Sequence, residues 1–303
     1  MAKIAIRTTL ILAAAMAMAA VTASAQQDFS KIEVKTTKVT DSFYTLEGAG
    51  GMVGVLVGPD GVFMVDSQFA PMSGKLAAAI KKITDKPIRF LVNTHVHGDH
   101  TGGDENFGKM GATIVARENL RYRLAYPNPL ANGQPSPVMP AVGLPMITYD
   151  APVTFHMNGE DIRLIPIKAA HTDGDTLVVF PNNDVIMTGD FFRSVQYPNI
   201  DRANGGNMNG MLEGLAMVIG LSGPNTKIIP GHGATVGREA VMAHRDILLA
   251  TKNRVAALIS QGKTQEEVVA AQPTKEFDAK ILEIGMTRDR FVGQVYQEIK
   301  AGK

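Results

Sequence analysis

The chain contains no cysteine among its 303 residues. This absence excludes disulfides, and it excludes thiolates both as metal ligands and as nucleophiles. It also excludes attachment of a lipid at a lipobox cysteine. Histidines, carboxylates and hydroxyls must therefore carry any chemistry.

The sequence also lacks an excess of charge of either sign. Its 30 lysines and arginines balance 29 aspartates and glutamates, which gives a formal net charge of +1. Such a balance provides neither a basic field for nucleic acid nor a polybasic patch for a membrane surface. Hydrophobic residues make up 45% and charged residues 19%, as in an ordinary globular protein. We therefore expect a small-molecule partner and no nucleic acid.

The first 25 residues have the pattern of a secretory signal peptide. A basic start precedes an apolar run from Thr9 to Val21, and Ala23-Ser24-Ala25 supplies small residues for cleavage. The apolar run is short for a membrane span, although an uncleaved anchor is the alternative interpretation. We expect a signal peptide at 1–25, one domain at 26–303 and a periplasmic protein without a membrane anchor after cleavage.

Apolar runs separated by turn signals predict two β-rich halves. The first half has strands expected at 31–39, 42–46, 52–57, 62–65 and 88–92, with a helix at 73–84. The second has strands expected at 153–155, 162–167, 177–180, 185–187 and 227–229, with helices at 210–221 and 238–259. The tail from Thr264 onward is typical of short surface helices. This order predicts two sheets packed face to face with helices outside.

One segment interrupts this pattern. Residues 126–145 hold six prolines and cannot form a regular element. A long irregular segment in a compact domain is either a lid or binding loop, or a passive surface excursion. The sequence leaves both possibilities open.

Ligand-capable side chains cluster directly after the strand expected at 88–92. The run Thr94-His95-Val96-His97-Gly98-Asp99-His100 holds three histidines and an aspartate. His95 and His97 can project to the same side, and Gly98 allows the chain to turn back toward them. Imidazoles and carboxylates are good ligands for zinc and its neighbours in the series. The run therefore predicts a metal site.

Three later residues stand in matching contexts. His171, Asp190 and His232 each follow the end of a short apolar strand and lie near a glycine. Strand ends at one sheet edge are where α/β proteins gather their sites. With the earlier run these residues fit a single site. His156 and His244 lack such contexts, so we expect them to be structural or solvated.

The run from Thr94 to Gly103 resembles the signature of the metallo-β-lactamase superfamily, and the three later residues are similar to its remaining ligand motifs. The resemblance covers nearly all of the mature chain. It implies an α/β fold, a four-layer αββα sandwich with two mixed β-sheets and a dinuclear metal site at one edge. It also implies a first metal held by His95, His97 and His171, a second held by Asp99, His100 and His232, and Asp190 as the bridge.

The resemblance further implies an exported hydrolase with two zinc ions per chain, or with iron or manganese in their place. Such an enzyme opens a small cyclic amide or ester through a metal-bound hydroxide, and β-lactamase activity leads the candidates. Asp99 is the expected catalytic residue, since it can orient the nucleophile. Two divalent ions, two carboxylates and one hydroxide leave the centre positive, so an anionic substrate is expected.

Two departures keep other activities open. Asp190 stands where familiar β-lactamase subclasses have cysteine, and Asp175 stands where glyoxalase II-like proteins tend to have histidine. The alternatives are a lactonase or thioesterase, and an iron-dependent sulfur oxidoreductase of the same superfamily. A phosphodiesterase or nuclease, and a non-catalytic zinc-binding protein, are more distant alternatives.

Candidate substrate contacts lie close to the expected bridging residue. Arg193 and Tyr197 follow it within one loop and can meet a substrate carboxylate, a task suited to arginine. The Gly48–Met52 stretch is either a flap over the metals or a simple turn between strands.

Three further residues are candidates for supporting the ligands. Lys168 and Thr172 flank His171 and can contact it. Asp66 ends a strand and can orient a ligand histidine.

Overall fold

The computed structural model describes residues 27–129, 133–281 and 286–302. The signal peptide expected at 1–25 lies outside these residues and stays a prediction. Within the described ranges, no helix combines the length and the apolar character needed to cross a membrane.

The first half of the chain forms a seven-stranded mixed sheet whose strands lie side by side in sequence order. They are β1 (Lys35–Lys38), β2 (Phe43–Glu47), β3 (Val53–Gly58), β4 (Gly61–Val65), β5 (Ile88–Val92), β6 (Thr113–Arg117) and β7 (Ile147–Tyr149). Strands β1 to β4 pair antiparallel through short turns, and β4 to β7 pair parallel. Parallel neighbours need crossovers, which contain α1 (Ser73–Ile83), α2 (Gly98–Thr101), α3 (Asp104–Lys109) and α4 (Glu118–Ala125).

The second half forms a five-stranded sheet in the order β12-β11-β10-β9-β8. Its strands are β8 (Val153–Met157), β9 (Glu160–Pro166), β10 (Thr176–Phe180), β11 (Val185–Met187) and β12 (Lys227–Ile229). The predicted hairpin at Asn158-Gly159 joins β8 to β9, and both turn residues have positive φ. Only β11 and β12 pair parallel, and the crossover between them contains α5 (Met208–Leu221).

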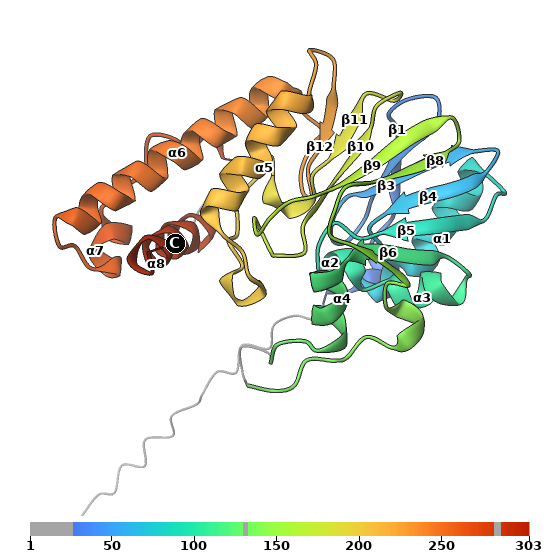
Figure 1. Cartoon of the computed structure of the whole chain (residues 1–303), viewed down its shortest axis with the longest axis horizontal. Coiled ribbons are helices and arrows are strands. Elements are labelled where there is room, and N and C mark those ends of the chain that lie inside the picture. Colours follow the sequence, from blue (N-terminus) through green and yellow to red (C-terminus); the bar gives the residue numbers. More distant parts are fainter. Residues whose placement is uncertain (1–26, 130–132, 282–285, 303) are drawn as a thin grey trace, which may run out of the picture.

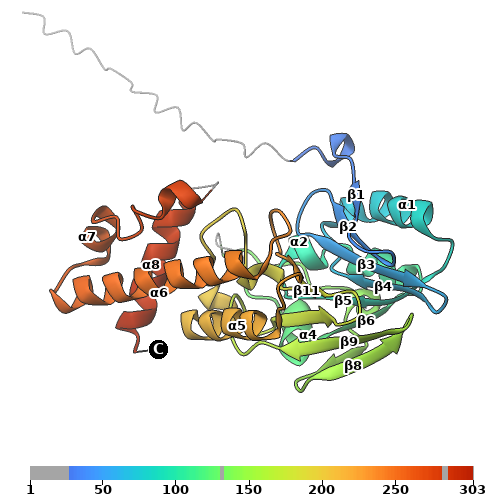
Figure 2. The ribbon, with the colours of Figure 1, turned by 90° about the horizontal axis from the view of Figure 1, so that it is seen from above.

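The two sheets lie face to face with helices on their outer sides (Figures 1 and 2), and apolar side chains fill the spaces between these layers. Phe43, Phe63 and Phe180 belong to the core between the two sheets. The first sheet packs its other face on α1, and the second packs its own on α5 and α6 (Arg238–Ser260). The expected αββα sandwich is therefore confirmed.

The C-terminal tail differs from the expectation of short surface helices. After α7 (Gln265–Ala270), helix α8 (Met286–Lys300) buries Phe291, Val292 and Val295 in the core on the second sheet's outer face. The spacing of these residues places them on one helix face. Helix α8 is thus an integral part of the outer layer.

The proline-rich segment at 126–145 is irregular, as expected, with one 3-10 turn at Ala141–Gly143 among its described residues. Near its start, the side-chain Nδ2 of Asn128 donates to the carbonyl of Ala203 at 3.0 Å and to Asn204 Oδ1 at 3.0 Å. These contacts fasten one end of the segment beside the loop that follows Asp190. A role as a lid stays a prediction.

Candidate metal centre

The seven candidate ligands come from four loops, each at the end of a strand. His95, His97, Asp99 and His100 follow β5, His171 follows β9, Asp190 follows β11 and His232 follows β12. Since β5 belongs to one sheet and the other three strands to the second, the cluster lies where both sheets end at one edge. The structure brings together all seven residues that the sequence singled out.

The side chains form two groups of possible metal ligands that share Asp190. One group is His95, His97, His171 and Asp190, and the other is Asp99, His100, His232 and Asp190. In each group, one ligand atom per residue lies within 4.8 Å of the others. The grouping matches the division between two metals that the resemblance implied.

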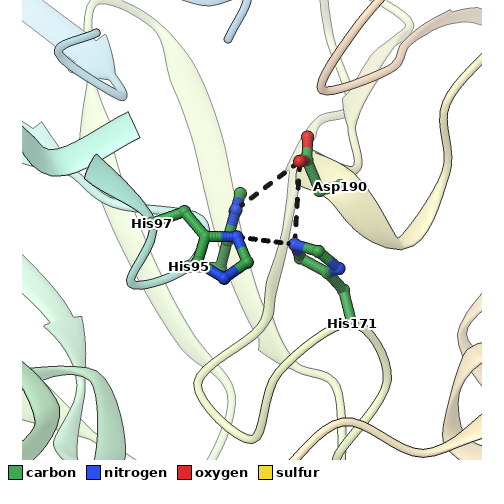
Figure 3. A group of neighbouring side chains, drawn as sticks. All are labelled: His95, His97, His171 and Asp190. Atoms are coloured by element: carbon green, nitrogen blue, oxygen red, sulfur yellow. Dashed lines mark hydrogen bonds and ion pairs between the residues drawn. The ribbon is translucent and has the colours of Figure 1, made fainter. Parts of the chain in front are cut away.

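In the first group, nitrogen atoms converge on one carboxylate oxygen (Figure 3). Asp190 Oδ2 lies 3.7 Å from His95 Nε2 and 3.6 Å from His171 Nε2. His97 Nδ1 lies 2.9 Å from His171 Nε2. Three nitrogens and an oxygen around one point are a donor set suited to zinc.

The second group uses the other oxygen of the shared carboxylate. Asp190 Oδ1 lies 3.3 Å from His100 Nε2 and 3.4 Å from His232 Nε2. Asp99 Oδ2 lies 3.1 Å from His232 Nε2. Because each oxygen of Asp190 faces a different group, this carboxylate is placed to bridge two ions.

Hydrogen bonds fix which nitrogen of each buried histidine is free. His100 Nδ1 donates to Asp66 Oδ2 at 2.7 Å, and His171 Nδ1 donates to the Asn199 carbonyl at 2.6 Å. In both rings this leaves Nε2, which faces its group, as the nitrogen available to an ion.

His97 shows the same arrangement with its nitrogens exchanged. Its Nε2 donates to Asp201 Oδ2 at 2.7 Å, which leaves Nδ1 free toward His171. Two lone pairs that face each other at 2.9 Å repel unless a proton or a cation lies between them. A metal ion resolves this repulsion.

Two buried atoms of the cluster have no hydrogen-bond partner in the described structure: His95 Nε2 and Asp190 Oδ1. Buried polar atoms without partners are costly, and each one calls for a physical explanation. Both atoms point into the candidate groups, and both belong to residue types that bind zinc. The residues present therefore fit a metal centre.

Electrostatics favour the protonation state that a metal needs at three ligands, His171, Asp190 and Asp99. Burial lowers the pKa of His171 to about 3, so this ring is neutral. Burial opposes ionisation of Asp190, but the charges of His100 and Arg193 outweigh it and hold the pKa of that carboxyl well below its usual value. For Asp99, the hydrogen bond from His232 and the charge of His100 similarly overcome burial and lower the pKa to about 2. His100 and His232 differ, because the Asp190 carboxylate outweighs burial and raises the pKa of both rings, so an ion that binds there would displace a proton.

The predicted support from Asp66 is present, since this carboxylate orients His100. It also accepts hydrogen bonds at 2.7 Å from the Thr94 amide and hydroxyl. The side chains of the two predicted supports of His171 do not orient its ring. The Thr172 hydroxyl donates to Asp175 Oδ1 at 2.6 Å, and the Lys168 side chain is exposed.

The Gly48–Met52 stretch is a packed support rather than a flap. The Gly51 amide donates to the Asp99 carbonyl at 2.9 Å, and the Met52 amide donates to the Gly231 carbonyl at 2.8 Å. A Cβ at Gly51 would lie 2.0 Å from His100 Cε1. The absence of a side chain at this position lets the chain pass directly beneath a ligand ring.

The two predicted substrate contacts have different surroundings. Arg193 is partly exposed, and its guanidinium donates to Asp190 Oδ2 and to Gln196 Oε1. Tyr197 is fully buried, and its hydroxyl donates to Asp278 Oδ1 at 2.7 Å. Since no part of Tyr197 reaches the surface, its position does not support the predicted contact with a substrate.

Asp201 and Asn199 orient ligands, a role that was not predicted from the sequence for either residue. They lie in the Tyr197–Asp201 loop, whose sequence carries no metal-ligand spacing of its own. The one available signal was the position of Asp201, a carboxylate in the loop that follows Asp190. The remaining histidines meet expectation: His156 is exposed and pairs with Asp161, and His244 is buried against Phe192.

A family model described as the metallo-beta-lactamase superfamily matches residues 47–250. The chain belongs to this superfamily. Members of the metallo-β-lactamase superfamily are metal-dependent hydrolases, among them β-lactamases and sulfatases. The superfamily typically binds metal ions, and the His/Asp groups described above can hold them.

The chain is also similar to solved structures and to one further relative. A metallo-β-lactamase from Pontibacter korlensis aligns with a TM-score of 0.59 at 18% identity, over 72% of this chain and 99% of its own. A stereoselective inverting sec-alkylsulfatase from a Pseudomonas species aligns with a TM-score of 0.64 at 17% identity, over 87% of this chain and 50% of its own.

A linear primary-alkylsulfatase from a Pseudomonas species is 21% identical over 254 residues, which cover 70% of this chain and 48% of that protein. The chain thus spans about half the length of the two alkylsulfatases it matches. The structural matches, all under 25% identical, establish the fold alone.

Proposed function

We propose that the chain is a dinuclear zinc hydrolase that opens a small, anionic cyclic amide or ester, with β-lactams as the leading substrates. The observation that carries this proposal is Asp190, which turns one carboxylate oxygen toward each group of ligands. Bound divalent ions would polarise the substrate carbonyl and lower the pKa of water.

The residues of the chain itself have separable tasks in this proposal. His95, His97 and His171 would hold one ion, His100, Asp99 and His232 the other, and Asp190 both. The Asp99 carboxylate is 23% exposed, which leaves it able to orient an attacking water. His97 and His232 are also partly exposed, at 25% and 24%, so the centre opens to substrate on their side.

Hydrolysis of alkyl sulfates is a second candidate function. The sec-alkylsulfatase aligns with 87% of this chain, whereas the Pontibacter β-lactamase aligns with 72%. The family model ends at residue 250, before α7 and α8. A sulfate ester is also anionic, as the expected positive centre requires.

One assay separates these functions. Purified protein, with its metal content measured, is tested against β-lactams, lactones, thioesters and alkyl sulfates, with and without a chelator. A His97→Ala variant serves as the inactive reference, and His156→Ala, an exposed histidine outside the cluster, is the matched control. We expect metal-dependent β-lactam turnover that His97→Ala abolishes and His156→Ala retains.

The other outcomes decide against parts of the proposal. Release of sulfate as the main activity supports the second candidate over the first. Metal-dependent turnover of no substrate would overturn the hydrolase proposal. A stoichiometry near one metal per chain would contradict the dinuclear centre, and iron in protein from its native host would contradict zinc.

A further inference from the structure

The C-terminal helix α8 contacts the segment that orients two ligands of the first group. This segment, Asn199–Asp201, supplies the carbonyl of Asn199 to His171 and the carboxylate of Asp201 to His97. The two histidines thus depend on three consecutive residues for their orientation. Whatever fixes those residues also fixes the free nitrogens of both rings.

One side chain of α8 holds this segment through two hydrogen bonds. Gln294 Oε1 accepts from the backbone amide of Ile200 at 3.0 Å, and its Nε2 donates to Asn199 Oδ1 at 2.8 Å. One bond holds the backbone at Ile200 and the other holds the side chain of Asn199, so a single amide group restrains two adjacent residues. The contact spans a sequence separation of more than 90 residues.

The helix that carries Gln294 is itself firmly placed. Phe291, one turn earlier, is fully buried and stacks on Tyr197 with ring centroids 5.5 Å apart and an interplanar angle of 9°. Val295 is also buried in the same apolar core. Packing of these neighbours therefore holds the helix backbone in place at Gln294.

The carboxylate of Asp201 is oriented from its other side as well. The Asn204 side chain donates to Asp201 Oδ2 at 2.7 Å, and the Asn204 amide donates to Oδ1 at 3.1 Å. The Asp201 amide donates to the carbonyl of His171 at 3.0 Å. Asp201 is therefore held independently of Gln294. A shift of Asn199 or Ile200 would change the position of the Asn199 carbonyl relative to the Asp201 carboxylate, and with it the orientation of His171 relative to His97.

We propose that Gln294 is a positioning residue for His97 and His171, and that α8 thereby tightens metal binding in the first group but not in the second. The inference rests on the proposed function, since it takes these histidines as metal ligands. In the second group, His100 is oriented by Asp66 at the end of β4, in the other sheet. Gln294 also lies beyond residue 250, where the family model ends.

Zinc affinity measured at each group separately tests the proposal. Replacing His232 by Ala leaves a chain with the first group intact, and replacing His97 by Ala leaves one with the second. Gln294→Ala is introduced into each background, and zinc dissociation constants are obtained by competition with a chromogenic chelator. The experiment uses the full chain, with folding checked by circular dichroism.

We expect Gln294→Ala to weaken zinc binding about tenfold in the His232→Ala background, the lower end of the range for residues that orient ligands. In the His97→Ala background the change should stay below twofold. Gln294→Glu retains an acceptor for Ile200 but loses the donor to Asn199, so its affinity should be intermediate. Gln261→Ala, an exposed glutamine at the end of α6, is the matched control and should change neither background.

Other results count against the proposal in distinct ways. An unchanged affinity in the His232→Ala background, or an equal loss in both backgrounds, would show that Gln294 serves only the stability of the fold. A lower melting temperature without an affinity change has the same meaning. If the unmutated chain binds no zinc, the proposed function fails and this inference fails with it.

Discussion

The two groups of the centre have the same kinds of ligands but different supports. In the first, His97 and His171 are oriented from the Asn199–Asp201 segment, which α8 holds in place. In the second, His100 is oriented by Asp66 and lies against Gly51, both in the N-terminal sheet region. The difference implies that each group can be weakened by substitutions that spare the other.

The largest expected effect comes from the one residue that the groups share. Asp190→Ala removes a ligand from both, so we expect zinc affinity at each to fall more than about 100-fold, beyond the range of residues that only orient ligands. Turnover should fall with it. Metal content after dialysis and steady-state kinetics check this expectation, and retention of one tight zinc ion would refute the shared role.

The supports of the two groups should separate apart from one link: the Thr94 hydroxyl, which donates to Asp66, also lies 3.1 Å from His95 Nδ1 in the first group. Asp66→Asn is expected to weaken the second group and Asp201→Asn the first, each by about 10- to 100-fold. Loss of the negative charge makes the paired imidazole a poorer ligand. The losses should combine without interaction in the double variant, since each acts on its own group. Chelator competition measures them, and a loss spread evenly over both groups would argue against separate supports.

A methyl group placed under the second group should act on it alone. Gly51→Ala builds a Cβ 2.0 Å from His100 Cε1, so the ring or the chain must move. We expect a loss of about 1–3 kcal/mol in stability, as for an overpacked core, together with weaker zinc binding in the second group. Chemical denaturation and chelator competition are the measurements.

Gly74→Ala is the matched control for this substitution, since no atom lies within 4 Å of a Cβ at that position. It should leave zinc binding unchanged and stability equal or slightly higher, because alanine favours a helix. Equal behaviour of the two alanine variants would show that the contact with His100 is not tight.

Acid should destabilise the fold through His244 of α6. Burial lowers the pKa of His244, which packs on Phe192, to about 4 from an ordinary value near 6.5. The unfolded chain therefore binds the proton more readily between these values, and the stability present above pH 6.5 is lost as pH falls toward 4. Linkage gives a loss of about 2 kcal/mol at pH 5. Urea unfolding of the metal-free chain at pH 7.5 and 5 is compared with that of His244→Leu. Both chains should lose stability in acid, because burial also lowers the pKa of His95 and His171, but the loss should be about 2 kcal/mol larger in the unmutated chain.

The smallest expected effect concerns a residue that the sequence suggested for substrate binding. Tyr197→Phe removes the hydroxyl that donates to Asp278, which should cost about 0.5–1.5 kcal/mol of stability. KM should change less than twofold, because the ring is buried. A large increase in KM with unchanged stability would restore the original prediction for this tyrosine.

The sequence predicted most where signals are local. The strand at Ile88–Val92 and the ligand run after it were found because apolar patterning and ligand spacing lie within a few residues of each other. Asp66 was found because a carboxylate at a strand end is a recurring support. Helix α8 was misjudged, since the core it covers is made by residues far away in the chain.

The missed supports have the same physical origin. The roles of Asp201 and Asn199 depend on contacts with His97 and His171, which only the folded chain brings close to them. One of the contacts is made by a backbone carbonyl, which any residue possesses. Contacts of this kind leave no trace in residue type or spacing, so only the three-dimensional arrangement shows them.

The ligand loops have one more consequence, which concerns unfolding. They connect points as distant in the chain as His95 and His232, and they join the two sheets. Ions bound there would link these points in the folded chain, and a ligand that binds only the folded state stabilises it by about 2.7 kcal/mol at a free concentration 100 times its dissociation constant. In a protein without cysteine, such a metal centre would stabilise the fold as disulfides do in other proteins, and removing the ions should lower the melting temperature of the whole domain.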